Sequence, residues 1–378
     1  MMEKQYVFSA PGRTEIGGNH TDHQHGCVLA AAVDLETVAD VTLNGSGDIV
    51  IRSEGYPEVR VNLSDLSVRE EEKNTTAALV RGVAAEFTRR GAKLQGFDAA
   101  VRSTVLPGSG LSSSAAFEVL IGTICNELFF DKKLSAVEIA QVGQYAENVY
   151  FGKPCGLMDQ SASSVGGMVF IDFNDPANPV VEKIDFDLQA AGYALCIIDT
   201  GADHADLTDE YAAIPCELKT VCDFFGQDTL RRVPENRFFR DLAQLRNHVT
   251  DRAILRAIHV YQENKRVIQQ VQALKTGNVK AFLELIKESG RSSWMYLQNI
   301  TPTGAVGNQE VALTLALCDT LLMDQGAYRV HGGGFAGTVQ AFVPLDMLNH
   351  FVSGMEAVLG PGKCHVLNIR PQGGIRVK

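Results

Sequence analysis

The sequence predicts an α+β fold, because strand and helix patterns are both present but do not alternate as they do in a doubly wound sheet. No internal repeat occurs, and the candidate strands are concentrated early in the chain. At 378 residues the chain is long enough for two domains, each with its own hydrophobic core.

Each predicted element follows from the spacing of its apolar side chains. Short runs of β-branched and aromatic residues predict strands, and apolar residues three or four apart predict amphipathic helices. Ser135 and Glu138 form a capping-box pattern at a helix start. The predicted strands are 38–43, 49–53, 59–63, 97–105, 167–173 and 193–199. The predicted helices are 77–89, 117–130, 135–150, 251–276 and 279–288, with a domain change near residue 200.

The charge balance argues against a nucleic-acid binder, because Asp and Glu outnumber Lys and Arg by 45 to 34. The first residues lack a basic segment followed by an apolar core, and no run approaches the roughly 20 apolar residues of a membrane span. We therefore expect a cytoplasmic protein that binds neither nucleic acid nor membrane. The eight cysteines are scattered without C-x-x-C spacing, which favours reduced thiols.

The segment from Ala10 to Gly26 has the composition of a site for a polar small molecule. Its glycines let a ligand approach the backbone, and Arg13 offers a planar fork for phosphate or carboxylate. His20 and Asp22 can hydrogen-bond sugar-like hydroxyls. Two alternatives remain open. The segment can be a solvated loop, or its histidines at positions 20, 23 and 25 can bind zinc, although their spacing is not the i, i+4 pair of zinc hydrolases.

A second motif, from Val105 to Glu118, reads as a strand, a glycine turn and a helix. Its serines therefore lie at a helix N-terminus, where free N–H groups and the helix dipole favour an anion. Serine hydroxyls can add donors or a magnesium ligand. A flexible Gly/Ser linker is the alternative, and the strongly apolar helix that follows directly argues against it. The motif predicts a phosphate cradle, although no Walker sequence occurs in the chain.

A third glycine cluster matches G-x-G-x-x-G at Gly332, Gly334 and Gly337. A dinucleotide fingerprint must open a helix. The run from Thr338 to Val343 is instead strand-like and ends at a proline. We therefore reject a Rossmann interpretation.

Together these motifs resemble the small-molecule kinases of the galactokinase, homoserine kinase, mevalonate kinase and phosphomevalonate kinase superfamily (GHMP kinases), and within it the galactokinases. The galactokinase signature is matched by Gly12-Arg13 and Gly18–Asp22, the phosphate loop by Gly108–Ala115, and the catalytic segment by Pro154–Gln160. The resemblance covers essentially the whole chain. It implies an N-terminal mixed-sheet domain over residues 1–200 and a C-terminal ferredoxin-like domain over residues 201–378.

The resemblance further implies transfer of the γ-phosphoryl group of ATP to a sugar, with galactose the expected acceptor and Mg²⁺ the cofactor. Asp159 is the implied base or orienter of the attacking hydroxyl, with Arg13 as its charge-stabilising partner. The implied sugar contacts are Asn19, His20, Asp22, Gly156 and Tyr211. The implied nucleotide contacts are Gly108, Ser109, Gly110, Leu111, Ser112, Ser113, Ser114 and Ala115, and the implied metal ligands are Ser113 or Ser114 with Glu147.

Some of these residues also have structural interpretations. Asp159 can be a helix N-cap, Glu147 a solvated helix residue, and Tyr211 an exposed helix aromatic. In the family a tyrosine usually stands at His23, and other side chains usually stand around Thr76 and Ala78, so we expect an altered adenine pocket. The segment 299–304 stands near the place of a family segment that this chain lacks.

Asn19 replaces a glutamate that contacts the C6 hydroxyl in galactokinases. An amide both donates and accepts hydrogen bonds, so we hypothesise that galacturonate is tolerated as a substrate. The alternative functions are a related sugar 1-kinase acting on galacturonate or N-acetylgalactosamine, a non-catalytic sensor of galactose and ATP, and a zinc hydrolase. The sequence is compatible with a monomer or a homodimer.

Overall fold

The computed structural model of the chain describes residues 5–105, 110–153, 155–202 and 207–378. The chain forms two compact units, each assembled from separate stretches of sequence. Unit 1 comprises Met1–Thr14, Ala31–Val169 and Ile369–Lys378, and unit 2 comprises Glu15–Ala30 and Phe170–Asn368. The division of the chain into an N-terminal domain (1–200) and a C-terminal domain (201–378) stays a prediction.

Unit 1 is built on a mixed sheet with the strand order β12-β1-β2-β5-β3-β4. These strands are β1 (Gln5–Gly17), β2 (Cys27–Leu43), β3 (Asp48–Ser53), β4 (Val59–Asn62), β5 (Phe97–Ser103) and β12 (Ile375–Arg376). β5 pairs antiparallel with β2 and parallel with β3. The solvated-loop interpretation is wrong for residues 10–17, because they lie in β1 and are all buried.

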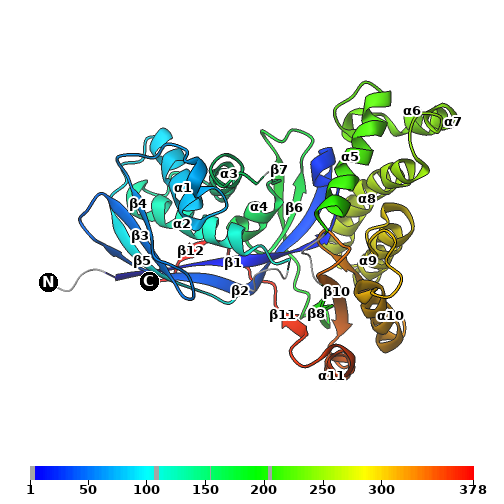
Figure 1. The fold of residues 1–378 in the computed structure, drawn as a ribbon. Helices are drawn as coiled ribbons and strands as arrows, with labels where there is room; N and C mark the ends of the chain where they lie inside the picture. The colour runs from blue at the N-terminus through cyan, green and yellow to red at the C-terminus, as the bar shows by residue number, and fades with distance from the viewer. Residues whose placement is uncertain (1–4, 106–109, 154, 203–206) are drawn as a thin grey trace. The chain divides into compact units, whose positions relative to one another are not determined.

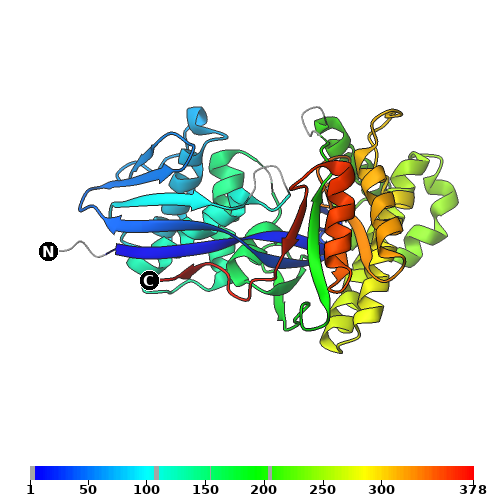
Figure 2. The ribbon, with the colours of Figure 1, turned by 90° about the horizontal axis from the view of Figure 1, so that it is seen from below.

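Helices cover one face of this sheet, as Figures 1 and 2 show from two directions. They are α1 (Thr76–Arg89), α2 (Ser113–Phe129), α3 (Ala136–Tyr145) and α4 (Met158–Val165). The core forms where Phe87 of α1 and Leu120 of α2 pack with Phe97 of β5. The capping box of Ser135 and Glu138 is confirmed at the start of α3. The predicted helix 135–150 is interrupted, because α3 continues into a π-helical turn, η3 (Ala146–Phe151).

Unit 2 contains an antiparallel sheet of order β11-β8-β10-β9. Its strands are β8 (Tyr193–Asp199), β9 (Ala327–His331), β10 (Thr338–Pro344) and β11 (Cys364–Leu367). Helices lie between β8 and β9, and α11 (Leu348–Leu359) lies between β10 and β11. This succession of strand, helix, strand, strand, helix and strand confirms the ferredoxin-like prediction.

The two faces of this second sheet carry different helices. Leu315 of α10 (Glu310–Leu322) and Phe351 of α11 share a core with Ala341 of β10. Phe342, the next residue of β10, meets Phe282 of α9 (Val279–Ser292) edge to face, with ring centroids 5.4 Å apart. Because successive strand residues point to opposite faces, α9 covers the face that α10 and α11 leave.

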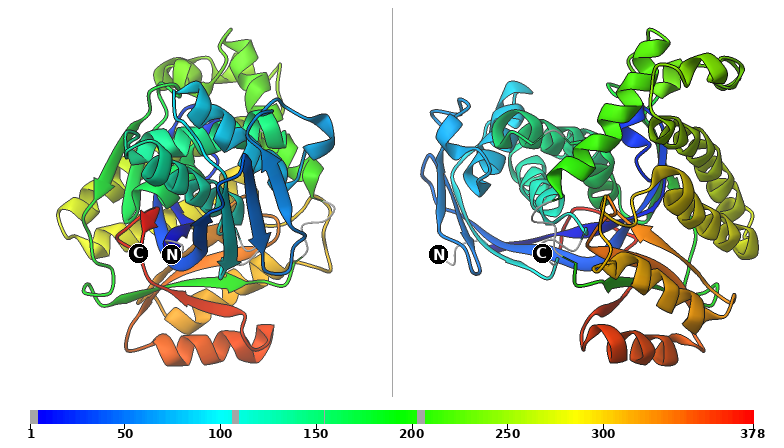
Figure 3. Two further views of the ribbon diagram at one scale, coloured as in Figure 1. Left: turned by 90° about the vertical axis from the view of Figure 1, so that its left-hand side faces the viewer. Right: turned by 45° about the vertical axis from the view of Figure 1, so that its right-hand side comes forward.

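The remainder of unit 2 is mainly helical. It contains the hairpin strand β7 (Val180–Ile184), which pairs with β6 (Met168–Asp172), and the helices α5 (Thr208–Phe224), α6 (Glu235–Arg240), α7 (Leu242–Leu245) and α8 (Asp251–Lys275). The long helices α8 and α9, both predicted, lie side by side (Figure 3). Over the residues that the structure describes, no helix has the length and apolarity needed to cross a bilayer.

Candidate active site

The second glycine-rich motif forms the N-terminus of α2, as predicted. Gly110 and Ser112 adopt left-handed backbone conformations, with φ of 72° and 53°, and the helix begins at Ser113. The Ser112 side chain does not cap the helix. The first-turn N–H groups and the positive end of the helix dipole therefore suit a phosphate.

The other predicted nucleotide contacts are distributed around this helix start. Ser114 lies in the first turn of α2 and Ala115 is buried in it. Leu111 is also buried, and its carbonyl accepts a hydrogen bond from the backbone N–H of Arg13 at 3.1 Å. Gly108 and Ser109 lie outside the described residues, as does Pro154 of the catalytic segment.

Arg13, Ser112 and Asp159 meet beside this helix start. Arg13 Nε donates to Asp159 Oδ1 at 2.7 Å, and Ser112 Oγ donates to Asp159 Oδ2 at 2.5 Å. Arg13 Nη1 also donates to the carbonyl of Gly110. Burial disfavours the charged form of Asp159, but Arg13 and Ser112 outweigh this effect and hold the pKa of the carboxyl below its usual value. Asp159 is therefore ionised at neutral pH.

The N-cap interpretation of Asp159 is wrong, because the N-cap of α4 is Leu157 and Asp159 lies within the first helical turn. A carboxylate in that turn is favoured by the helix dipole. The backbone therefore adds to the reasons why Asp159 stays charged.

Glu147 lies in the π-helical turn η3 and is only 2% exposed, so it is not a solvated helix residue. Ser114 Oγ donates to its Oε1 at 3.3 Å, and Lys153 Nζ lies 3.4 Å from the same oxygen. Mg²⁺ binds proteins through one or two carboxylates and completes its shell with phosphates and water. The Ser114 hydroxyl and the Glu147 carboxylate fit this ion.

A buried amide holds Glu147 from the other side. Gln160 Nε2 donates to Glu147 Oε2 at 2.8 Å and to Glu118 Oε2 at 2.9 Å. Burial, with the charge of Glu147, raises the pKa of Glu118 well above its usual value. The sequence analysis did not identify Gln160 or Glu118 as site residues. A glutamate within the apolar run of α2 is the signal that could have identified Glu118.

A pocket of about 450 Å³ opens beside the start of α2 within unit 1. Its apolar wall includes Tyr56, Leu79, Phe117 and Phe151, and Ser113 and Ser114 line the side next to α2. This volume lies in the range of ligand sites, and an aromatic and aliphatic wall suits a nucleobase. Of the positions expected to alter the adenine pocket, Thr76 lines it, whereas Ala78 is buried in the core.

The third glycine cluster is a turn between β9 and β10, so rejection of the Rossmann interpretation is confirmed. Gly334 has a φ of 83°, and a Cβ there would lie 2.1 Å from the carbonyl oxygen of Asn299. Only glycine fits that position. This turn, residues 332–334, is the glycine turn referred to from here on.

Side chains distant in sequence donate to the carbonyls of the glycine turn. Asn19 Nδ2 donates to Gly332 at 2.6 Å, and His20 Nε2 donates to Gly333 at 3.0 Å. Asn299 Nδ2 also donates to Gly333, at 3.0 Å, and Tyr211 OH donates to Gly334 at 2.9 Å. The structure thus brings the predicted sugar contacts Asn19, His20 and Tyr211 together on one backbone turn.

The Asn19 amide is only 1% exposed and is saturated with partners inside unit 2. Besides Gly332, its Nδ2 donates to Glu15 Oε1 at 3.2 Å, and its Oδ1 accepts from Asn299 Nδ2 at 2.9 Å. An amide nitrogen has two hydrogens, and both are used. Asn299 belongs to the segment 299–304, which differs from the family pattern, as does Asn19. The two residues that differ from the family therefore contact each other.

The histidines form a hydrogen-bonded relay with assignable protons. Gln24 Nε2 can only donate to His23 Nδ1, at 3.2 Å, so His23 carries its proton on Nε2 and donates to His20 Nδ1 at 3.3 Å. His20 then carries its proton on Nε2, facing the carbonyl of Gly333. Burial, reinforced by His20, lowers the pKa of His23 to about 3. Among the described residues, no group of three or more His, Cys, Asp or Glu side chains is arranged to hold a metal.

The other predicted sugar contacts are Asp22 and Gly156. Asp22 begins the short 3-10 turn η1 (Asp22–Gln24) in unit 2 and is half-buried. Gly156 lies in unit 1, is exposed and precedes α4. Tyr211 packs edge to face on Phe335, with ring centroids 5.6 Å apart, so it is not a free helix aromatic.

Comparisons with known proteins give matches to family models and to solved structures. Residues 78–167 match the GHMP kinases N-terminal domain, and residues 2–42 match the galactokinase galactose-binding signature. A Lactococcus lactis galactokinase, solved in complex with galactose, is 24% identical with a TM-score of 0.82, over 98% of this chain and 95% of that chain. The Methanococcus jannaschii mevalonate kinase is 14% identical with a TM-score of 0.69, over 98% and 99%.

The chain therefore has the fold of the GHMP kinases, and its residues 78–167 match the N-terminal domain of that family. Its N-terminal strand and turn carry the galactose-binding signature of one branch of that family. The chain is accordingly a sugar phosphotransferase of the galactokinase type.

Proposed function

We propose that the chain transfers the γ-phosphoryl group of ATP to the C1 hydroxyl of galactose, giving galactose 1-phosphate and ADP. The observation that carries the proposal is the contact of Arg13, Ser112 and Asp159 at the start of α2. A phosphoryl-transfer site needs a fixed cation, N–H donors and a group that directs the nucleophile, and these residues supply all three.

In this reaction the sugar oxygen forms a bond to the γ-phosphorus while the bond from that phosphorus to the β–γ bridging oxygen breaks, and ADP leaves. Asp159 accepts a hydrogen bond from the attacking hydroxyl and directs its lone pair. Its lowered pKa makes it a weak base, so orientation rather than early proton removal is its contribution. The hydroxyl proton is lost to solvent once the new bond has formed.

Arg13 and the N–H groups at the start of α2 are proposed to stabilise the charge on the transferring group and on the leaving ADP. Bound Mg²⁺ would supply further positive charge to the phosphates. Ser114 and Glu147 would hold it, with Ser113 as the alternative hydroxyl, and Gln160 keeps the Glu147 carboxylate oriented. The adenine ring is proposed to occupy the unit 1 pocket lined by Tyr56 and Phe151.

On the sugar side, His20, Asp22, Tyr211 and the backbone at Gly156 are proposed as contacts. Asn19 contributes indirectly, by fixing the glycine turn, because its own donors are used within the chain. This saturation removes the reason to expect that galacturonate replaces galactose, so galactose is the proposed substrate.

The test is Mg²⁺-dependent ADP release from ATP with galactose, galacturonate, N-acetylgalactosamine, glucose and fucose. Asp159→Asn is the loss-of-function variant, and Asp223→Asn, which removes an exposed ion pair with Lys219, is its matched control. We expect turnover with galactose that Asp159→Asn abolishes and Asp223→Asn preserves. Turnover with galacturonate but not galactose would overturn the substrate assignment. ATP and galactose binding without turnover would indicate a sensor.

We also propose a cytoplasmic location, since ATP is the phosphoryl donor, and a monomer or homodimer as the acting form. Size-exclusion chromatography with light scattering distinguishes these two forms.

A further inference from the structure

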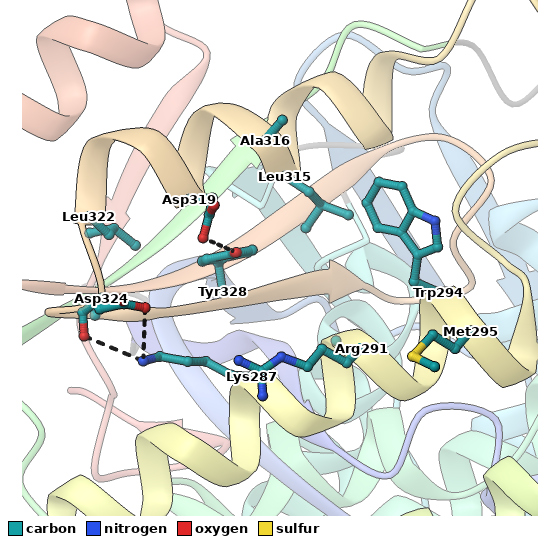
Figure 4. A pocket seen from close by; sticks show the side chains of 12 residues that line it. Lys287, Arg291, Trp294, Met295, Leu315, Ala316, Asp319, Leu322, Asp324 and Tyr328 are labelled. Carbon is teal, nitrogen blue, oxygen red and sulfur yellow. Dashed lines mark hydrogen bonds and ion pairs between the residues drawn. The ribbon is translucent and has the colours of Figure 1, made fainter.

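A second pocket, of about 320 Å³, lies within unit 2, and none of its lining residues is assigned to the reaction. It is bounded by α9, the π-helical turn η5 (Ser293–Leu297), α10 and β9 (Figure 4). This volume lies at the lower end of the range for small-molecule sites. The pocket therefore accommodates a single small ligand rather than a peptide or a lipid surface.

One end of the pocket is aromatic and apolar. Trp294, the single tryptophan of the chain, is 49% exposed, and Met295 beside it is 60% exposed. In Figure 4 the indole stands above η5, on the side of Leu315. A large indole left half uncovered at a pocket wall offers a flat surface on which a planar or sugar ring stacks. π-helical turns often occur at functional sites, and here the turn carries this aromatic residue.

The middle of the pocket carries the positive charge of Arg291. Arg291 lines the pocket and is exposed, and among the described residues it has no ion-pair partner. Lys287, one helical turn earlier on α9, is only 10% exposed and is already neutralised by Glu284, at 3.0 Å, and by Asp324. Arg291 is thus the cation that a ligand would meet, and its planar fork fits a phosphate through two parallel hydrogen bonds.

The acidic residues limit how much negative charge the ligand can carry. Asp319 lines the pocket and accepts a hydrogen bond from Tyr328 OH at 2.6 Å, and Asp324 closes the far end. These carboxylates oppose a chain of several phosphates, whereas one phosphate group can lie on Arg291 away from them. The charge pattern favours a monophosphate over ATP.

We propose that this pocket binds a ring compound bearing one phosphate group, with the ring on Trp294 and the phosphate on Arg291. A nucleoside monophosphate and a sugar monophosphate share this chemistry. The site acts independently of the reaction proposed above, and its test does not require turnover.

The experiment uses Trp294 as its own reporter, since no other tryptophan contributes to the fluorescence. The full chain is titrated separately with AMP, galactose 1-phosphate, adenosine, galactose and inorganic phosphate. We expect a saturable change in tryptophan emission with at least one of the two monophosphates. Adenosine, galactose and inorganic phosphate, each lacking half of the proposed chemistry, should bind at least about tenfold more weakly.

Arg291→Ala should weaken the binding of that monophosphate at least about tenfold, because a charge-assisted bidentate contact is lost. Arg240→Ala, which removes an exposed arginine paired with Asp241, is the matched control and should leave binding unchanged. Response to AMP alone identifies a nucleotide site, and response to galactose 1-phosphate alone identifies a sugar phosphate site. The proposal is overturned if neither monophosphate gives a saturable change, or if Arg291→Ala binds as tightly as the unmodified chain.

Discussion

Ser112 combines a backbone strain with a hydrogen bond, so two substitutions at this position separate the two effects. Its φ of 53° places a Cβ in the left-handed region, which costs about 1–2 kcal/mol for any residue but glycine. Its hydroxyl donates to Asp159 Oδ2. Ser112→Ala removes the hydrogen bond and keeps the strain, whereas Ser112→Gly removes both.

The stabilities should therefore differ between the variants while the rates do not. Relief of strain by glycine, about 1–2 kcal/mol, is opposed by its greater unfolded-state entropy, roughly 0.5–1 kcal/mol. Ser112→Gly should thus be about 1 kcal/mol more stable than Ser112→Ala. Both variants lose the hydrogen bond to the Asp159 carboxylate, whose side chain is 28% exposed. A hydrogen bond to a charged group contributes about 1.5–3 kcal/mol, and partial exposure places this one at the lower end of that range. We therefore expect kcat to fall about tenfold in each variant.

Urea unfolding measures the stabilities, and ADP release at saturating substrate measures kcat. Ser67 is the matched control, because its hydroxyl also donates to an aspartate, Asp65, but its φ is not positive. At Ser67 the glycine variant should be no more stable than the alanine variant. If Ser112→Gly is no more stable than Ser112→Ala, the strain argument is wrong. If either variant keeps the original kcat, the role given to the Ser112 hydroxyl is wrong.

Further predictions concern the carboxylates and the glycine turn. Because Arg13 and Ser112 hold the pKa of Asp159 below its usual value, activity that depends on its ionised form should be lost only as pH falls through that lowered pKa. Arg13→Met should move that acidic limb of the pH–rate profile upward, and an unmoved limb would contradict the pairing. Glu147→Gln should raise the Mg²⁺ concentration for half-maximal rate at least about tenfold, measured by Mg²⁺ titration after chelation, and an unchanged requirement would argue against it as a ligand. Asn19→Asp should lower the free energy of unfolding by about 3 kcal/mol, because it places a buried charge beside Glu15 and a carbonyl, and an unchanged urea midpoint would refute that network.

The sequence alone predicted the elements whose causes are local. The start of α2, the capping box of α3 and the long helices α8 and α9 depend on residues a few positions apart. Such patterns survive without knowledge of the fold, because helix caps and apolar periodicity act within a few turns. The strand-like run after the third glycine cluster was sufficient to reject a dinucleotide site.

The strand β1 could not be predicted, because its polar residues resemble those of a loop. Arg13 and Glu15 are buried there only because partners from distant segments, Asp159 and Arg329, satisfy their charges. A run of polar residues indicates solvent exposure only when no distant side chains pair with it. The sequence does not show which distant side chains will do so.

The sequence by itself therefore determined the class of chemistry, since a sugar signature, a phosphate cradle and an acidic residue in a catalytic segment are all short motifs. Only the tertiary structure decided what each side chain does. Asn19, whose residue type suggested a sugar contact, donates to a turn 313 positions further along the chain and accepts from Asn299, 280 positions away. Hydrogen-bond capacity is finite, so the partners that the fold supplies determine whether a polar side chain remains available to a substrate.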